Sequence, residues 1–304
     1  MTPCSANQDQ LQAALGRHVK LKTGVEILYW GFLSCHFSGR SDNIKFMRVV
    51  IVMPTYNEAQ NVGGMIDMVC GEIFRRISPV DMHLLVVDDN SPDGTGSIVR
   101  KKMMQYANLH LSSGIKKSLG KAYVRGIRYA VENLSPDALI EMDADFQHDP
   151  GYLPQMVAAF RDGADYVIGS RFIPGGSIPN GWAWYRRAIS RLGNSFARYM
   201  LNIGDLHDFT TGYRLTRVNG VLDQIDLKHL RRLDRFAYKV DLLYKTAQKA
   251  AKIVEIPICF AARRHENSKF QFSEIIATLQ VIILLKLEDN RLVQKIKKRN
   301  VFST

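Results

Sequence analysis

The stretch RVVIVMPTYNE (48–58) joins a run of apolar, largely β-branched residues to a polar turn. A continuous apolar run that ends at a proline is typical of a strand buried on both faces of a parallel sheet. The residues that follow carry apolar side chains at spacings of three and four over 62–77, which predicts one amphipathic helix. A buried strand followed by a helix is the repeating unit of α/β folds.

The same alternation continues downstream of this first unit. Further strands are predicted at 82–87, 138–142 and 166–168, with helices at 121–132 and 152–160. The pattern predicts the fold class α/β, with a mainly parallel central sheet and helices on both faces. Ligands of such sheets bind beyond the carboxyl ends of the strands, so polar residues just after the strands are the first candidates for a site.

Acidic side chains gather at these predicted strand ends. Glu58 follows the first strand, Asp88 and Asp89 follow the second, and Asp143 and Asp145 follow a later one. The chain as a whole is basic, with 41 Lys and Arg against 29 Asp and Glu and a net charge of +12. A local concentration of carboxylates in a basic protein points to a dedicated site at this edge of the sheet.

The DAD motif at 143–145 is the strongest candidate for a metal site. Asp143 and Asp145 are two residues apart at the end of an apolar strand, so their side chains are expected on the same face. Hard divalent ions such as Mg²⁺ and Mn²⁺ take carboxylate and phosphate oxygens, so this pair suits a metal that also holds a diphosphate. Gln147 can add a carbonyl oxygen. The alternative is a solvated loop whose aspartates cap the helix that begins near Pro150.

The run DDNSPDGT (88–95) combines a turn with two carboxylates that the turn does not require. Ser91 to Thr95 build the turn, and Thr95 is expected to cap the next helix. Asp88 and Asp89 are then left to accept hydrogen bonds from a nucleobase or a ribose. The third glycine of a dinucleotide fingerprint is replaced by Val99, which disfavours a dehydrogenase.

Composition narrows the class of protein and of partner. Hydrophobic residues make up 46% and charged residues 23% of the 304, which is typical of a globular protein and excludes wholesale disorder. The net charge favours an anionic partner, either a phosphorylated substrate or a lipid surface. Nucleic acid is not expected, because no recognisable binding motif is present and the carboxylates at the strand ends would repel a polyanion.

Three segments are predicted along the chain. Residues 1–46 are interrupted by glycines and are interpreted as a poorly ordered extension, 47–270 as the main domain, and 271–304 as an amphipathic, basic tail. The four cysteines show no metal-binding or disulfide spacing. The longest apolar stretches, 25–37 and 275–285, fall short of the about 20 residues that span a bilayer, so no transmembrane helix is expected.

A second candidate site lies on the helix predicted from Tyr185 to Ile203. Its basic residues Arg187, Arg191 and Arg198 fall opposite an apolar stripe, and Trp182 and Trp184 are expected to precede it. Such a composition is typical of a lipid headgroup boundary, and equally of an ordinary surface helix packed through its stripe. The stripe comprises Tyr185, Ile189, Leu192, Phe196, Tyr199, Met200 and Ile203.

Seven motifs follow one another along the chain: PTYNE (54–58), DDNSPDGT (88–95), LGKA (119–122), MDADFQHDP (142–150), GSRF (169–172), Asp208 with TGYR (211–214), and Arg263 with Ser268 and Lys269. Taken in this order, they resemble the dolichol-phosphate mannosyltransferases, or polyprenol monophosphomannose synthases, over about residues 47–270. The resemblance implies a GT-A nucleotide-sugar fold with Mg²⁺ or Mn²⁺ as cofactor.

The resemblance also implies roles for individual residues. Arg186 and Ser190 are expected to bind the phosphate of a lipid acceptor, and Asp145, Arg171, Arg186 and Ser190 are the expected catalytic residues. The nucleoside would be lined by Pro54, Tyr56, Glu58, Val87 and Asp89, the metal and diphosphate by Asp143, Ala144, Asp145 and Gln147, and the phosphates by Arg171, Arg263 and Lys269.

The expected activity is transfer of mannose, with inversion, from GDP-mannose to a polyprenyl phosphate. The acceptor oxygen is already largely anionic near neutral pH, so the reaction needs no strong general base. Glu266 stands where the family commonly has glycine, which leaves UDP-glucose or another nucleotide sugar as an alternative donor. A nucleotide-sugar-binding protein without turnover is the alternative class. The expected location is peripheral, on the cytoplasmic face of a membrane, with a membrane-anchoring subunit as a further candidate partner.

Overall fold

The computed structural model describes residues 47–179, 181–204, 206–261 and 272–301, with side chains described as far as Asp289. These residues belong to one compact unit, Lys45–Thr304. The extension predicted at 1–46 lies outside the described residues, as do Arg263, Glu266 and Lys269.

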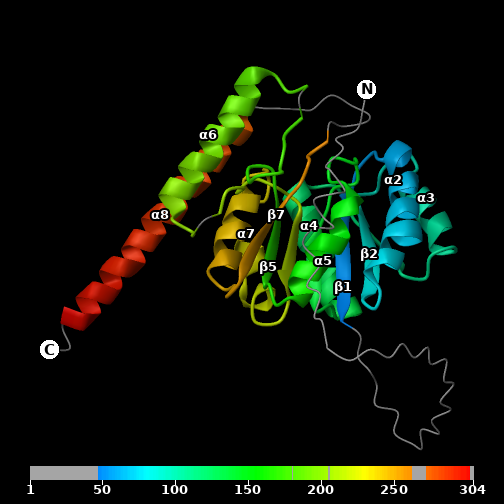
Figure 1. Ribbon diagram of the computed structural model, residues 1–304, viewed down its shortest axis with the longest axis horizontal. Coiled ribbons are helices and arrows are strands. Elements are labelled where there is room, and N and C mark those ends of the chain that lie inside the picture. The colour runs from blue at the N-terminus through cyan, green and yellow to red at the C-terminus, as the bar shows by residue number, and fades with distance from the viewer. Residues whose placement is uncertain (1–46, 180, 205, 262–271, 302–304) are drawn as a thin grey trace, which may run out of the picture. The chain divides into compact units, whose positions relative to one another are not determined.

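A seven-stranded sheet in the order β3-β2-β1-β4-β6-β5-β7 forms the centre of the protein (Figure 1). Its pairs are parallel except for β6, which runs antiparallel to both β4 and β5. The predicted mainly parallel α/β sheet is therefore confirmed. The strands are β1 (Arg48–Thr55), β2 (Asp81–Asp88), β3 (Leu109–Ser113), β4 (Ala138–Glu141), β5 (Tyr166–Ser170), β6 (Arg214–Arg217) and β7 (Ile253–Pro257).

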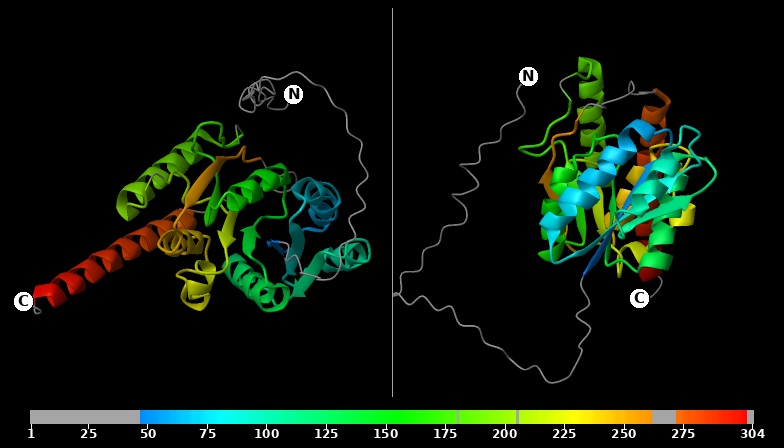
Figure 2. Two further views of the ribbon diagram at one scale, coloured as in Figure 1. Left: turned by 60° about the horizontal axis from the view of Figure 1, so that its bottom comes forward. Right: turned by 90° about the vertical axis from the view of Figure 1, so that its right-hand side faces the viewer.

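Helices cover both faces of this sheet (Figure 2). Alternate side chains of β1 enter opposite cores, with Ile51 packing on the side of α2, α3 and α5 and Val52 on the side of α4 and α7. This alternation is why β1 reads as a continuous apolar run. The helices are α2 (Ala59–Ile66), α3 (Thr95–Met103), α4 (Leu119–Leu134), α5 (Leu153–Arg161), α6 (Trp184–Leu201), α7 (Tyr238–Ala247) and α8 (Phe272–Val301).

The prediction of one regular amphipathic helix over 62–77 is wrong, because the helix type changes along this segment. After α2 the chain continues as a π-helix, η1 (Asp67–Ile73), and then as a 3₁₀-helix, η2 (Phe74–Ile77). Val69 and Ile73 stay buried through the change of helix type. The apolar spacing reports which face is buried but does not distinguish these helix types. Further 3₁₀ turns are η3 (Pro150–Tyr152), η4 (Leu222–Gln224) and η5 (Leu227–His229).

Helices α6 and α8 lie side by side and share a third core with β5 and α7 (Figure 1). Ala197 and Leu201 of α6 meet Ala277, Val281 and Leu285 of α8 in this core. Trp184, expected before the helix, is its first residue. Among the described residues, no helix combines the length and the hydropathy needed to cross a membrane.

Candidate functional site

A cavity of about 610 Å³ opens beyond the carboxyl ends of β1, β2, β4 and β5. It reaches from the turn after β1 to the facing sides of α6 and α8. This is the edge of the sheet at which the sequence predicts a site. The cavity brings together most of the predicted residues: Pro54, Tyr56, Glu58, Asp89, Asp143, Ala144, Asp145, Gln147, Arg171, Arg186 and Ser190.

The wall after β1 presents an aromatic ring and a lysine. The Tyr56 ring is partly exposed, and the Lys116 ammonium lies 3.2 Å from its centroid in a cation–π contact. Glu58 accepts a hydrogen bond from the Asn61 amide at 2.7 Å. A flat ring beside charged and carboxylate groups is a surface on which a nucleobase can stack.

Asp88 and Asp89, adjacent in sequence, have different environments. Asp88 is buried in the turn, where its carboxylate accepts hydrogen bonds from the Ser91 hydroxyl at 2.6 Å and the Thr55 hydroxyl at 3.2 Å. Asp88 does not line the cavity, and both of its oxygens already accept hydrogen bonds within the turn, so the structure does not support the expectation that it binds a nucleoside. Asp89 lines the cavity and forms an ion pair with Arg125 at 2.7 Å.

Two further expectations about this turn are corrected. Gly94, with φ +92°, precedes α3, and Thr95 is the first helical residue rather than its cap. The Thr95 hydroxyl instead accepts a hydrogen bond from the Glu58 backbone N–H at 3.0 Å, tying the two strand ends together. Val87, expected beside the nucleoside, does not line the cavity. It is fully buried in β2, against α4 at Gly126.

Asp143 and Asp145 both line the cavity, but from a loop and not from a strand. Strand β4 ends at Glu141, and the loop bends at Phe146 with φ +61°. Asp145 is buried and accepts the Gln147 backbone N–H at 3.1 Å. Asp143 accepts the Tyr123 hydroxyl at 2.8 Å. The loop, and not strand alternation, brings the two carboxylates to one cavity.

His148 supports this loop as a neutral imidazole. Burial lowers the pKa of His148 to about 4. The nearby Asp143 carboxylate raises this pKa, but it offsets the effect of burial only in part. Its Nδ1 accepts the Asp143 backbone N–H at 3.0 Å, and its ring stacks on Tyr213 with centroids 4.9 Å apart. The 3.5 Å approach of His148 to the Asp143 carboxylate is therefore no ion pair near neutral pH. These contacts give His148 a structural role in the loop.

The side-chain oxygens of the DAD loop fit a hard divalent ion that is also bound by the phosphates of a substrate. Among the residues that the structure describes, His, Cys, Asp and Glu side chains do not gather in groups of three or more suited to a metal. Two carboxylates, Asp143 and Asp145, with the Gln147 side chain nearby, leave coordination positions for phosphate oxygens and water. This arrangement suits a metal bound together with a diphosphate.

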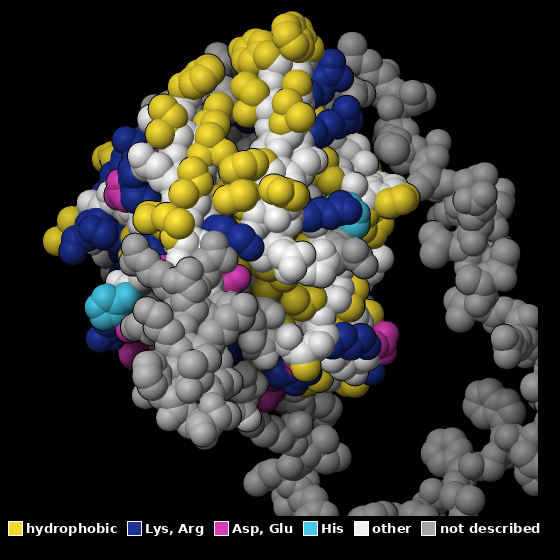
Figure 3. All heavy atoms as spheres, turned by 90° about the vertical axis from the view of Figure 1, so that its left-hand side faces the viewer, with side chains coloured by type: hydrophobic (Ala, Val, Ile, Leu, Met, Phe, Trp, Pro, Cys, Tyr) yellow, Lys and Arg dark blue, Asp and Glu magenta, His cyan; other side chains and the backbone are white. Residues whose placement is uncertain are grey.

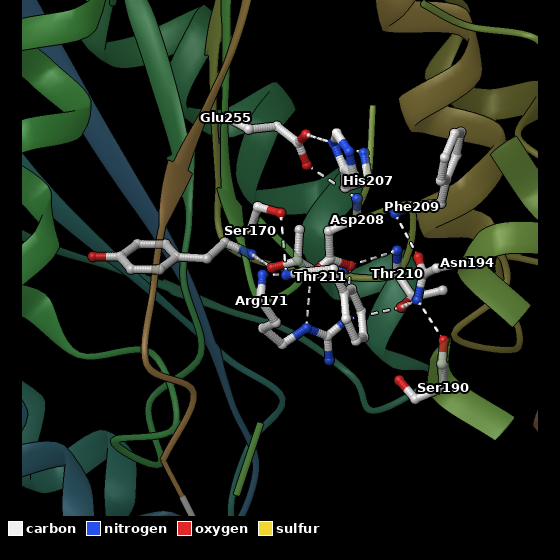
Figure 4. Close-up of polar contacts among 12 residues, drawn as sticks. Ser170, Arg171, Ser190, Asn194, His207, Asp208, Phe209, Thr210, Thr211 and Glu255 are labelled. Atoms are coloured by element: carbon white, nitrogen blue, oxygen red, sulfur yellow. Dashed lines mark hydrogen bonds and ion pairs between the residues drawn. The ribbon is translucent and has the colours of Figure 1, made fainter. Parts of the chain in front are cut away.

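Arg171, predicted to bind phosphate, stands in a network that links the sheet to α6 (Figure 4). Its guanidinium donates to Asp208 through Nε at 2.7 Å and through Nη2 at 2.8 Å, and Nη2 also reaches the Thr210 hydroxyl. Asn194 of α6 donates to the same Thr210 hydroxyl at 3.2 Å and accepts the Phe209 N–H at 2.7 Å. Nη1 of Arg171 makes no hydrogen bond to a described residue, and Arg171 lines the cavity.

The far end of the cavity combines a basic group with an apolar wall. Arg186 stacks on the Trp182 ring at 3.7 Å, and Ser190 lies one turn further along α6. Residues Ile275, Leu279 and Ile282 of α8 face Ile189 of α6 across the cavity, together with Phe236. The cavity thus has a charged end at the sheet and, between the two helices, a mostly apolar end that also includes Glu274 and Thr278 of α8.

Sequence reasoning did not identify several cavity residues. Lys116 was not singled out as a site residue, and α8 was interpreted only as an amphipathic tail, although this helix forms one wall of the cavity. Asn194, which lines the cavity, and Tyr123, which contacts Asp143 without lining it, appear in helical patterns in which their roles are hidden. Only their polar atoms on a buried face could have marked them. Arg263 and Lys269, the other predicted phosphate ligands, lie outside the described residues.

Comparisons with known proteins agree with this geometry. Residues 50–222 match the family described as Glycosyl transferase family 2. A polyprenol monophosphomannose synthase from Mycolicibacterium smegmatis is 35% identical over 232 residues, covering 75% of this chain and 83% of that protein. An undecaprenyl-phosphate mannosyltransferase from Micrococcus luteus is 39% identical over 224 residues, covering 73% of this chain and 87% of that protein.

Solved structures share the fold at low identity. Glucosyl-3-phosphoglycerate synthase from Mycobacterium tuberculosis, in complex with Mn²⁺, UDP and phosphoglyceric acid, matches with a TM-score of 0.53 at 14% identity, covering 79% of this chain and 78% of that one. Mannosyl-3-phosphoglycerate synthase from Rubrobacter xylanophilus matches with a TM-score of 0.54 at 18% identity, covering 81% and 76%. The fold is therefore GT-A-like.

Proposed function

We propose, on the premise that this chain belongs to glycosyl transferase family 2, that it transfers mannose from GDP-mannose to a polyprenyl phosphate. The chain is a glycosyltransferase by family, and its curated relatives are named for mannose and for polyprenol or undecaprenyl phosphate. One observation carries the choice of acceptor. A single cavity joins a carboxylate-rich end at the sheet to an apolar end between α6 and α8.

The two ends of the cavity match the two halves of such a reaction. Tyr56 and Asp89 would bind the nucleoside, and Asp143, Asp145 and Gln147 would hold Mg²⁺ or Mn²⁺ with the diphosphate. When bound, the divalent ion would neutralise the negative charge that develops on the departing nucleoside diphosphate. A protein with the same fold was solved in complex with Mn²⁺ and UDP, which supports the use of a divalent ion together with a nucleoside diphosphate.

The acceptor phosphate would lie between the two ends. Arg186 and Ser190 can bind it with charge-assisted hydrogen bonds, while Ile189 and the α8 side chains contact the first isoprene units. An oxygen of the acceptor phosphate then forms a bond to the anomeric carbon as the bond from that carbon to the diphosphate oxygen breaks. A single displacement of this kind inverts the anomeric configuration. Arg171 would stabilise the diphosphate side through its remaining Nη1.

The outer surface of α6 and α8 supports contact with a membrane. Of the fifteen large hydrophobic side chains that the structure describes as exposed, nine belong to these two helices. Figure 3 shows hydrophobic side chains gathered on this side of the molecule, with Lys and Arg at its edges. We call this surface the α6–α8 face; it comprises Trp184, Tyr185, Leu192, Tyr199, Phe272, Ile276, Ile283, Leu284 and Leu287.

The α6–α8 face would place the apolar end of the cavity at the lipid surface, where a polyprenyl phosphate resides. Aromatic and aliphatic side chains enter the acyl boundary while basic groups meet anionic headgroups. We therefore place the protein peripherally, on the cytoplasmic face of a membrane. A membrane-anchoring subunit that covers the same face is the competing arrangement.

The test is incubation of pure protein with Mg²⁺ or Mn²⁺, a short-chain polyprenyl phosphate and a panel of radiolabelled nucleotide sugars. We expect a labelled glycolipid from GDP-mannose, with a β-linked sugar. Product from UDP-glucose alone would replace the donor and keep the reaction class. Donor binding by calorimetry without product from any sugar would instead identify a nucleotide-sugar-binding protein.

Asp145→Ala is the matching variant for the metal site. We expect it to fold and to lose more than about 100-fold in turnover, because it removes one of two carboxylates that hold the ion. Asp149→Ala serves as the control, since Asp149 is a carboxylate of the same loop that accepts the Gly151 N–H and does not line the cavity. Equal activity of the two variants would remove Asp145 from the site.

A further inference from the structure

Tyr123 is a fully buried tyrosine whose hydroxyl reaches the edge of the cavity. It lies on α4, on the face that packs against β1 and β2. Its ring does not line the cavity, yet its hydroxyl donates to Oδ1 of Asp143 at 2.8 Å. Tyr123 therefore contacts a proposed metal ligand without itself lining the space that a substrate would occupy.

A buried ion pair holds the Tyr123 ring in turn. The Lys239 ammonium lies 3.7 Å from the ring centroid and 2.9 Å from Oε1 of Glu141. All three side chains are buried, and they come from α4, α7 and β4. A cation over the ring face polarises the phenol and makes its O–H a stronger donor. The result is a continuous path, Glu141 to Lys239 to Tyr123 to Asp143.

The neighbouring tyrosine shows that burial alone does not create this contact. Tyr238 is also fully buried, and its ring centroid lies 6.4 Å from that of Tyr123. Its hydroxyl finds no hydrogen-bond partner among the described residues. The two rings share one core, but only Tyr123 touches the acidic pair.

We propose that Tyr123 is a positioning residue that fixes the carboxylate of Asp143 in the orientation that binds the divalent ion. The proposal rests on the proposed function, because it concerns the metal–diphosphate site of that reaction. A hydrogen bond to Oδ1 sets the plane of the carboxylate before the ion arrives, so less ordering is needed on binding. Outer partners of metal ligands commonly change metal affinity by about 10- to 100-fold.

The test measures Mn²⁺ binding directly. Free Mn²⁺ is followed by electron paramagnetic resonance during titration of the protein in the presence of GDP. Tyr123→Phe removes only the hydroxyl, and we expect it to weaken Mn²⁺ binding by at least about 10-fold. Tyr238→Phe is the matched control and should bind Mn²⁺ within about 2-fold of the wild type, because its hydroxyl has no partner to lose.

Kinetics separate positioning from general damage to the fold. For Tyr123→Phe the Mn²⁺ concentration at half-maximal rate should rise by the same factor as the dissociation constant. The rate at saturating Mn²⁺ and the KM for the acceptor should stay within about 3-fold of the wild type. A purely structural role would instead lower the thermal midpoint and the rate without a selective loss of Mn²⁺ affinity.

A second variant examines the same path from its far end. Lys239→Gln keeps a donor for Glu141 and removes the cation from the Tyr123 ring, and we expect about 2- to 5-fold weaker Mn²⁺ binding. It carries the test if Tyr123→Phe does not fold. Wild-type Mn²⁺ affinity in both folded variants, or in Lys239→Gln alone if only that variant folds, would overturn the positioning role. Absence of Mn²⁺ binding by the wild type with GDP would contradict the metal site itself.

Discussion

Arg171 and Asp208 form a bidentate ion pair in the interior, with Nε and Nη2 of the guanidinium 2.7 and 2.8 Å from the two carboxylate oxygens. Asp208 also accepts the backbone N–H groups of Arg171 and Thr211. The pair therefore fixes both the loop after β5 and the loop before β6 beside the cavity. Under the proposed function, Arg171 would meet the diphosphate with its charge already partly neutralised by Asp208, so it would contribute a positioned charge and not an excess charge.

Asp208→Asn tests this ion pair. The change leaves the buried Arg171 guanidinium without its counter-charge, and we expect the free energy of unfolding at about pH 7 to fall by about 3–5 kcal/mol. Urea unfolding followed by circular dichroism measures it. The double variant Arg171→Met with Asp208→Asn should recover part of this loss. No recovery would mean that the hydrogen bonds of Asp208 to the loop, and not its charge, carry the stability.

The same pair predicts a pH dependence with a definite sign. Burial alone would raise the pKa of Asp208, but the Arg171 charge and the hydrogen bonds to its carboxylate hold that pKa below the ordinary 3.8. The unfolded chain then binds the proton more readily, so this stability is fully present above the ordinary pKa and is lost as the pH falls through it toward the folded value. The difference between wild type and Asp208→Asn should stay constant above about pH 5 and shrink as the pH falls further through 3.8. A difference independent of pH would contradict the lowered pKa.

Asn194→Ala tests the link from α6 to the same loop. It leaves the buried Phe209 N–H without an acceptor, which costs about 1–3 kcal/mol of stability, and it frees α6 from Thr210. Because α6 carries Arg186 and Ser190, we expect the KM for the polyprenyl phosphate to rise by about 5-fold or more, with a smaller change for the nucleotide sugar. Steady-state kinetics with Asn133→Ala, an exposed asparagine on α4, provide the control. Equal changes in both KM values would exclude a selective effect on the acceptor.

The sequence predicted what is local in this fold. Strands such as β1 appear as apolar runs, and the carboxyl ends of parallel strands meet at one edge, so Asp89, Asp143 and Asp145 were found without coordinates. Asp88 was misinterpreted because two adjacent carboxylates look alike in sequence. Only the turn geometry shows that Ser91 engages one of them.

The rest depends on contacts between residues far apart in the chain. Tyr123 and Lys239 each sit in an ordinary helical pattern, and their meeting requires α4 and α7 to pack on the same face of the sheet. Helix α8 reads as a basic tail by composition, but Ile275 and Ile282 close the cavity because the helix packs against α6 and α7. Periodicity predicts that a face is buried and does not identify its partner.

Gly126→Ala tests the close packing of α4 on the sheet. A methyl group at this position would lie 2.6 Å from Cγ1 of Val52 and from Cγ2 of Val87, both in the core. We expect a loss of about 1–3 kcal/mol in stability from this overpacking, measured by urea unfolding. Gly63→Ala is the matched control in helix α2, because its new methyl would meet only Ile98 at 3.6 Å. The free energy of unfolding of the control should rise by about 0.5–1 kcal/mol, because alanine has a higher helix propensity than glycine. Equal destabilisation of both variants would contradict the packing argument.

The α6–α8 face predicts that the protein binds directly to a lipid surface. Leu192 and Tyr199 are 69% and 82% exposed and project from α6. Burial of each of these apolar side chains in the membrane contributes about 1.5–3 kcal/mol to binding. The double variant Leu192→Asp with Tyr199→Asp removes this contribution and introduces charge, so vesicle binding should weaken by at least about 10-fold. Cosedimentation with phosphatidylcholine vesicles, with and without phosphatidylglycerol, measures it. Because Leu192 and Tyr199 do not line the cavity, activity on a short, detergent-soluble acceptor should be retained.

The control for this face is Met103→Asp with Met104→Asp, two exposed apolar residues at the end of α3. This variant should bind vesicles as the wild type does, since α3 packs on another part of the sheet. Anionic lipid should strengthen binding of the wild type, and salt should reverse that gain, because basic side chains contribute about 1 kcal/mol each near such a surface. If the wild-type protein binds neither kind of vesicle but still glycosylates the soluble acceptor, the result would favour an anchoring subunit on the α6–α8 face over direct contact with lipid.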